Sequence, residues 1–187
     1  IVTAPIHEPE VEELFSKADV LVVLGSQLDG MNTKNWTIKW PAKIIVVDAD
    51  PAMTMRNVDP VAVVVHNNIG QVAKGLVAET PARTSWADVT QLNNDVRARL
   101  RVGEKSKRGI ALVEAIEQNW PTEGTIVCDM SVCGYWTGVY AIQPRPRRIV
   151  YPVGWGTLGF GLPAAIGPAA HGSPTLAVCG DGGVAFA

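Results

Sequence analysis

The sequence predicts an α/β fold of two parallel-sheet segments, each in three layers and each incomplete, joined by a helical linker. Short apolar runs that end in Gly or Asp recur along the chain, as is typical of strands buried on both faces of a parallel sheet. Stretches with helical spacing separate these runs, which is the alternation of βαβ units. Hydrophobic residues make up 47% of the 187 positions and charged residues 18%, enough apolar material for a sizeable core.

The first segment, residues 1–80, has the pattern of strands joined by crossover helices. Its predicted strands are the apolar runs at residues 18–25, 43–48 and 61–65. Its predicted helices cover residues 10–17 and 69–77. Because a parallel connection needs such a crossover, we expect the three strands to run in the same direction.

Residues 81–108 have a different character and are predicted to be the linker. Val89, Leu92, Val96 and Leu100 recur at three- and four-residue spacing among charged residues, which indicates an amphipathic surface helix. Ser85 precedes this pattern and is the candidate N-cap.

The second segment, residues 109–187, resumes the alternation. Its predicted elements are helices at 110–116 and 160–169 and strands at 125–129, 148–151 and 175–179, with a further helix beginning near Gly182 and Gly183. The carboxyl ends of parallel strands meet at one edge of a sheet, so the residues that follow these strands are expected to lie together.

The motif Gly180-Asp181-Gly182-Gly183 follows the last apolar run. Its carboxylate suits a hard divalent cation such as Mg2+, and its glycines allow a phosphate to approach the backbone amides closely. The structural alternative is a tight strand-to-helix turn in which Asp181 is only the N-cap.

A second motif, Gly154-Trp155-Gly156-Thr157-Leu158-Gly159, matches G-x-G-x-x-G in outline. Pro152 weakens this interpretation. Proline has no backbone N–H group, and the central strand that should lead into the glycines needs that donor for its hydrogen bonds. A Gly-rich turn before a tightly packed helix is the alternative. The third motif, residues 129–136, also follows a buried strand and includes Ser131, Val132 and Cys133.

Taken together, these segments resemble the diphosphate-binding domain of thiamine-diphosphate enzymes. The resemblance is to the group of acetolactate synthase, benzoylformate decarboxylase and related 2-keto-acid decarboxylases and carboligases. It rests on the run from Tyr151 to Gly167, which contains Gly-Phe-Gly-Leu-Pro-Ala-Ala-Ile-Gly, and on the downstream Gly180-Asp181-Gly182-Gly183. Residues 10–78 resemble the second half of the middle domain of the same family.

The resemblance implies roles for individual residues. The cofactor thiamine diphosphate would contact Ser131, Val132, Gly156, Thr157, Leu158, Gly180, Gly182 and Gly183, and Asp181 would bind Mg2+. Leu158 would be the apolar wedge under the bent cofactor, and the Gly156 carbonyl would accept a hydrogen bond from its amino group. No catalytic residue is expected in this chain, because the family's glutamate belongs to a domain before Ile1. The Arg-rich segment that flavin-binding members have at this position is absent after Gly25, so FAD is not expected.

The sequence therefore predicts a central fragment of a decarboxylase or carboligase that acts on a small 2-keto acid and is inactive alone. The full-length protein would be a cytoplasmic homodimer or homotetramer. The net charge of −2, the lack of a basic face and the lack of a long apolar run argue against nucleic-acid and membrane partners. Two alternatives stay open: a nicotinamide-dependent oxidoreductase that uses Gly154–Gly159, and a non-catalytic structural domain.

Overall fold

The computed structural model describes residues 3–52, 58 and 63–187. The chain forms two compact units, residues 1–93 and 94–187, and each is described by itself. Each unit contains a three-stranded parallel sheet, so the predicted α/β class with parallel strands is confirmed.

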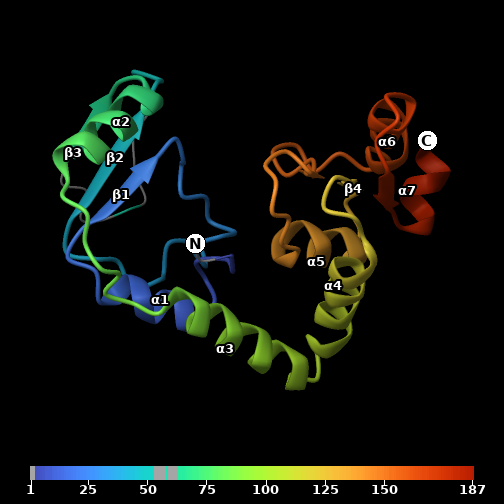
Figure 1. Cartoon of the computed structure of the whole chain (residues 1–187), viewed down its shortest axis with the longest axis horizontal. Coiled ribbons are helices and arrows are strands. Elements are labelled where there is room, and N and C mark those ends of the chain that lie inside the picture. Colours follow the sequence, from blue (N-terminus) through green and yellow to red (C-terminus); the bar gives the residue numbers. More distant parts are fainter. Residues whose placement is uncertain (1–2, 53–57, 59–62) are drawn as a thin grey trace. The chain divides into compact units, whose positions relative to one another are not determined.

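The sheet of the first unit has the strand order β1-β2-β3. Its strands are β1 (Leu21–Leu24), β2 (Ile44–Asp48) and β3 (Val63–His66), and its helices are α1 (Pro9–Ser16) and α2 (Ile69–Glu79). The middle strand is the most buried, with Ile44, Val46 and Val47 almost inaccessible to solvent. In Figure 1, α2 lies beside this sheet. Positions 61 and 62 of the third predicted strand lie outside the described residues.

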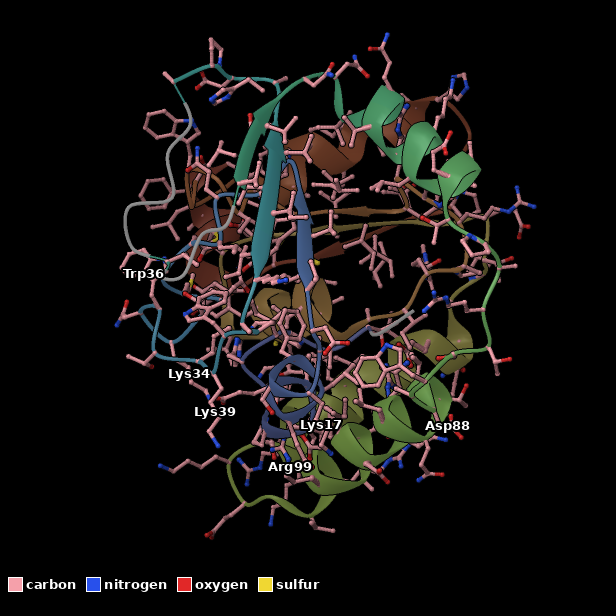
Figure 2. All side chains as sticks on the ribbon, turned by 90° about the vertical axis from the view of Figure 1, so that its left-hand side faces the viewer. Lys17, Lys34, Trp36, Lys39, Asp88 and Arg99 are labelled. Atoms are coloured by element: carbon pink, nitrogen blue, oxygen red, sulfur yellow. The ribbon has the colours of Figure 1, made fainter. Side chains whose placement is uncertain are left out.

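The connection between β1 and β2 is bound to α1 by one carboxylate. Glu12 accepts a hydrogen bond from Lys34 Nζ at 2.6 Å and another from the Lys39 amide at 3.2 Å. Figure 2 shows Lys34 and Lys39 on this loop beside α1. The Lys34 ammonium group, as a hydrogen-bond donor, lowers the pKa of Glu12 below its ordinary value. This loop is therefore folded back on the helix rather than extended.

The second unit is built on the strand order β5-β4-β6. Its strands are β5 (Ile149–Val150), β4 (Thr125–Cys128) and β6 (Thr175–Val178). Its helices are α4 (Lys107–Asn119), α5 (Val132–Tyr140), α6 (Gly161–Ala170) and α7 (Asp181–Phe186). All four residues of the middle strand β4 are buried, which explains why a short apolar run was sufficient to predict it.

Helix α3 (Val89–Val102) crosses the boundary between the units. Its cap differs from the sequence prediction, because the carboxylate of Asp88 accepts the Gln91 N–H at 2.9 Å. The hydroxyl of Ser85 instead donates to the carbonyl of Ala87. Asp88 directly precedes the first helical residue, which is the position from which a side chain reaches the third amide of a helix. Ser85 lies too far upstream to do so.

Helix α5 was not among the predicted helices. It is apolar on all sides and contains two glycines, so it has no helical periodicity to detect. Its start is fixed by Ser131, whose hydroxyl accepts the Gly134 N–H at 3.0 Å. Glycines allow α5 to pack closely, because a side chain at Gly109 of α4 would overlap the Trp136 ring and one at Gly138 of α5 would lie 2.6 Å from the Tyr151 ring.

A partly buried ion pair joins α3, α4 and the end of α5 in the second unit. The guanidinium of Arg97 binds both carboxylate oxygens of Glu117 at 2.8 Å and also donates to the Tyr140 carbonyl. Glu117 in turn accepts the Ile142 N–H at 2.7 Å. Because Glu117 satisfies two segments at once, this pair has a larger structural role than a surface salt bridge.

None of the helices in the described part of the chain is both long enough and apolar enough to cross a membrane.

We predict that Glu117→Ala lowers the free energy of unfolding of the second unit by about 2 kcal/mol, because it removes the carboxylate that binds Arg97 and leaves the Ile142 amide without its acceptor. Urea unfolding followed by circular dichroism measures this change. The matched control is Glu123→Ala, which breaks the exposed pair with Arg145 and should leave the unfolding midpoint unchanged. Equal effects of the two substitutions would contradict the prediction.

Candidate functional site

The three sequence motifs of the second unit follow the three strands of one parallel sheet. Residues 129–131 connect β4 to α5, residues 151–160 connect β5 to α6, and Cys179 and Gly180 connect β6 to α7. Since all pairings are parallel, these connections leave the sheet at its carboxyl edge. The structure therefore brings the motifs together at the edge where ligands bind in open α/β sheets.

A cavity of about 440 Å³ lies at this edge. Most of the residues predicted from the sequence line it, and Met130, Cys133 and Phe186 complete its wall. The predicted residues in the lining are Ser131, Val132, Leu158, Gly180, Asp181, Gly182 and Gly183. Gly156 and Thr157 do not line it, although they belong to the same turn as Leu158. The volume lies within the range of small-molecule sites.

Asp181 is the first residue of α7, and its side chain is exposed. Gly180 is the N-cap, and no side chain makes a capping hydrogen bond there. Within the described part of the chain, the Asp181 carboxylate has no hydrogen-bond or ion-pair partner. Its oxygens are therefore available to a ligand or cation in the cavity.

Gly182 and Gly183 differ in their surroundings. A side chain at Gly182 would meet nothing within 4 Å, whereas one at Gly183 would lie 2.8 Å from Oδ2 of Asp129. Packing therefore requires glycine at position 183 even without a ligand. Both amides belong to the first turn of α7, where N–H groups have no acceptor within the helix.

The Gly-rich turn 154–159 has two residues in the left-handed region, Gly156 with φ +62° and Gly159 with φ +77°. The turn places Leu158 in the cavity wall with 56% of its surface exposed. This strand-and-turn geometry is a poor match to a dinucleotide fingerprint. The preceding strand β5 has only two residues and lies to one side of β4.

Asp129 is a residue of the site to which sequence reasoning gave no role. It follows β4, is fully buried, and accepts three backbone N–H groups. Its Oδ1 accepts from Met130 at 2.7 Å and from Gly159 at 3.1 Å, and its Oδ2 accepts from Gly161 at 3.0 Å. The available signal was an acidic residue directly after a completely buried strand, where a charge needs partners that the sequence does not display.

The cysteines of the site differ in environment. Cys133 is exposed in the cavity wall, whereas Cys128 is buried in β4. Burial raises the pKa of the Cys128 thiol to about 12, with a smaller contribution from Cys179. Burial and the neighbouring Asp129 carboxylate also raise the pKa of Cys179. Cys128 and Cys179 are therefore protonated in the folded protein near neutral pH and are not nucleophiles.

Two family models match this chain. Residues 2–76 match the central domain of thiamine pyrophosphate enzymes, and residues 129–187 match their C-terminal thiamine-pyrophosphate-binding domain. The second match covers all the predicted site residues.

Curated relatives match over nearly the whole chain. A protein named "Probable 2-ketoarginine decarboxylase AruI" from Pseudomonas aeruginosa is 31% identical over 93% of this chain and 32% of its own length. The acetolactate synthase large subunit of Haemophilus influenzae is 26% identical over 94% of this chain and 32% of its own length. The large subunit of acetolactate synthase isozyme 1 from Escherichia coli is 29% identical over 90% of this chain and 31% of its own length. The chain thus spans about a third of the length of these relatives.

We predict that the buried Cys128 thiol makes the folded protein less stable in alkali. Its pKa of about 12 exceeds the value of 9.0 for a free thiol, so the unfolded chain loses this proton first. The free energy of unfolding should be unaffected by this group below pH 9. It should then fall by up to about 1.4 kcal/mol per pH unit as the pH rises from 9 to 12.

Cys128→Val should remove this part of the alkaline decline, as measured by urea unfolding at each pH. Ile126→Val, on the same strand, keeps the thiol and should lower stability by a similar amount at every pH. Parallel pH profiles of the wild type and Cys128→Val would show that the thiol does not contribute.

Proposed function

Because this chain belongs to the thiamine pyrophosphate enzyme family, we propose that it forms the diphosphate-binding part of a 2-keto-acid decarboxylase or carboligase. The single observation that carries the proposal is the cavity lined by Leu158 and residues 180–183 at the carboxyl edge of the sheet. Thiamine pyrophosphate is the cofactor also called thiamine diphosphate. When bound, it supplies a nucleophilic ring carbon and an electron sink for decarboxylation of a 2-keto acid.

The residues of this chain suit the two ends of such a cofactor. The first-turn amides of Gly182 and Gly183 can donate to phosphate oxygens, because they have no acceptor within α7. Leu158 presents an apolar, half-exposed surface to the same cavity. We propose that the diphosphate binds to the Gly182 and Gly183 amides and that the thiamine rings lie against Leu158. Gly156 and Thr157, in the same turn as Leu158, would also contact the rings.

Mg2+ is the metal we propose, with Asp181 as one of its ligands. A diphosphate buried in a cavity needs a cation, and Mg2+ is usually held by one or two carboxylates together with phosphate oxygens and water. Asp181 fits this role, because its carboxylate is exposed and unpartnered within the described part of the chain. Over the same residues, no cluster of three His, Cys, Asp or Glu side chains could hold a metal alone. The other ligands would therefore come from the diphosphate, water and further groups.

Ser131, the N-cap of α5, and Val132, its first residue, also line the cavity. The Ser131 oxygen already accepts the Gly134 N–H, but its O–H remains able to donate to a ligand. We propose that these two residues contact the cofactor. A small 2-keto acid as substrate, a homodimer or homotetramer as the assembly, and a cytoplasmic location are the remaining parts of the proposal. The names of the relatives support the substrate, the free cysteines support the location, and the assembly is what the family resemblance implies.

The test is titration calorimetry of the chain with thiamine diphosphate in the presence and absence of Mg2+. We expect binding that requires Mg2+ and that weakens at least about 100-fold in Asp181→Asn, because the metal loses the negative charge of a direct ligand. Glu104→Gln removes an exposed carboxylate outside the cavity and should bind like the wild type.

NADH serves as the comparison ligand. Binding of NADH instead of thiamine diphosphate would favour a nicotinamide-dependent enzyme and contradict the proposal. Binding of neither ligand would favour a purely structural role for this chain. Metal-independent binding of thiamine diphosphate would contradict the assignment of Asp181.

A further inference from the structure

The buried carboxylate of Asp129 joins two of the segments that form the cavity. It follows β4, and its oxygens accept the amides of Gly159 at 3.1 Å and of Gly161 at 3.0 Å. Gly159 ends the Gly-rich turn, and Gly161 begins α6. The turn that carries Gly156 and Leu158 is therefore tied at its end to the middle strand of the sheet.

The third segment packs against the same carboxylate. A side chain at Gly183 would lie 2.8 Å from Oδ2 of Asp129, and one at Gly161 would lie 2.9 Å from its Cβ. A side chain at Gly134 would overlap the Asp129 carbonyl oxygen. Glycines of α5, α6 and α7 thus approach Asp129 from three directions. Asp129 therefore contacts both the Gly-rich turn and α7, which also approach each other directly at Gly159 and Phe186.

A carboxylate is the side chain that this arrangement requires. All three groups around it are N–H donors, and an ionised carboxylate offers only acceptors. Hydrogen bonds to a charged acceptor are about twice as strong as those between neutral groups. An asparagine of the same shape would turn an NH2 group toward one of these donors and leave that donor without an acceptor.

We propose that Asp129 is a positioning residue for the cofactor: it sets the distance between the part of the site facing the thiamine rings and the part facing the diphosphate. This inference rests on the proposed function. Asp129 is buried behind the cavity wall, so it acts through the backbone of residues 159–161 and not by touching the cofactor. Its loss should weaken binding of the whole cofactor but not binding of the diphosphate portion.

The test compares two ligands in Asp129→Asn, each with Mg2+: thiamine diphosphate and inorganic pyrophosphate. Thiamine diphosphate contacts both parts of the site, so its affinity should fall about 10-fold or more when one buried N–H loses its acceptor. Pyrophosphate needs only residues 180–183, and asparagine keeps the volume beside Gly183, so its affinity should stay within about 2-fold of wild type. A variant with a generally damaged fold would lose both ligands.

A second variant disturbs the contact between Asp129 and Gly161 by changing the glycine. Gly161→Ala would place a methyl group 2.7 Å from the Cys179 sulfur and 2.9 Å from Cβ of Asp129, which should push the turn away from its acceptor. Gly167→Ala is the matched control in the same helix, because nothing lies within 4 Å of its added methyl group. We expect the ligand-selective loss in Gly161→Ala and wild-type affinities in Gly167→Ala.

Amide hydrogen exchange of the wild type tests the tether even if a variant fails to fold or no cofactor binds. The amides of Gly159 and Gly161 lie in a turn and at the first position of a helix, where exchange is normally fast. Bonds to a buried carboxylate should slow their exchange at least 10-fold relative to the open Gly154 amide.

Two results would overturn the inference: equally fast exchange of these three amides, or an Asp129→Asn variant that binds both ligands like the wild type. The wild-type chain could instead show protected Gly159 and Gly161 amides but bind neither thiamine diphosphate nor pyrophosphate. That result would refute the proposed function and would still support the hydrogen bonds from these amides to Asp129.

Discussion

The architecture of the second unit depends on one buried negative charge. An isolated carboxylate inside a protein is strongly destabilising, and three backbone N–H groups from two segments offset that cost at Asp129. The requirement extends to the neighbouring sequence, because the three surrounding helices can approach Asp129 this closely only where they carry glycine. Three glycines and one aspartate thus determine where the three segments meet. The cavity lies between those segments.

The two acidic residues at this edge illustrate how environment separates roles. Asp129 is inaccessible and has every oxygen engaged by the backbone, which makes it a structural acceptor. Asp181 is exposed and has no partner in the described part of the chain, which leaves it free for a cation. Both follow apolar strands of the same sheet and are similar in sequence context. Only the segments that fold over each residue distinguish a carboxylate that supports the site from one that is open to a ligand.

The sequence was most informative where burial leaves a simple pattern. The strands β2, β4 and β6 were predicted to within one residue, because each is a continuous apolar run that ends at a polar or glycine residue. Helix α5 was missed, since an apolar, glycine-containing helix has no periodicity. The predicted cap at Ser85 was wrong, because capping requires the residue directly before the helix, which is Asp88. The partners of Asp129 are backbone amides 30 and 32 residues away, and no side-chain pattern shows such contacts.

A crystal structure of the chain with thiamine diphosphate and Mg2+ tests the central claim most directly. The account predicts that Asp129 still accepts the Gly159 and Gly161 amides, while the diphosphate lies on Gly182 and Gly183 and Asp181 binds the metal. A cofactor bound at this edge with the Asp129 side chain turned to solvent, or bound to the metal itself, would contradict the account, because the turn would then hold its position without the buried carboxylate.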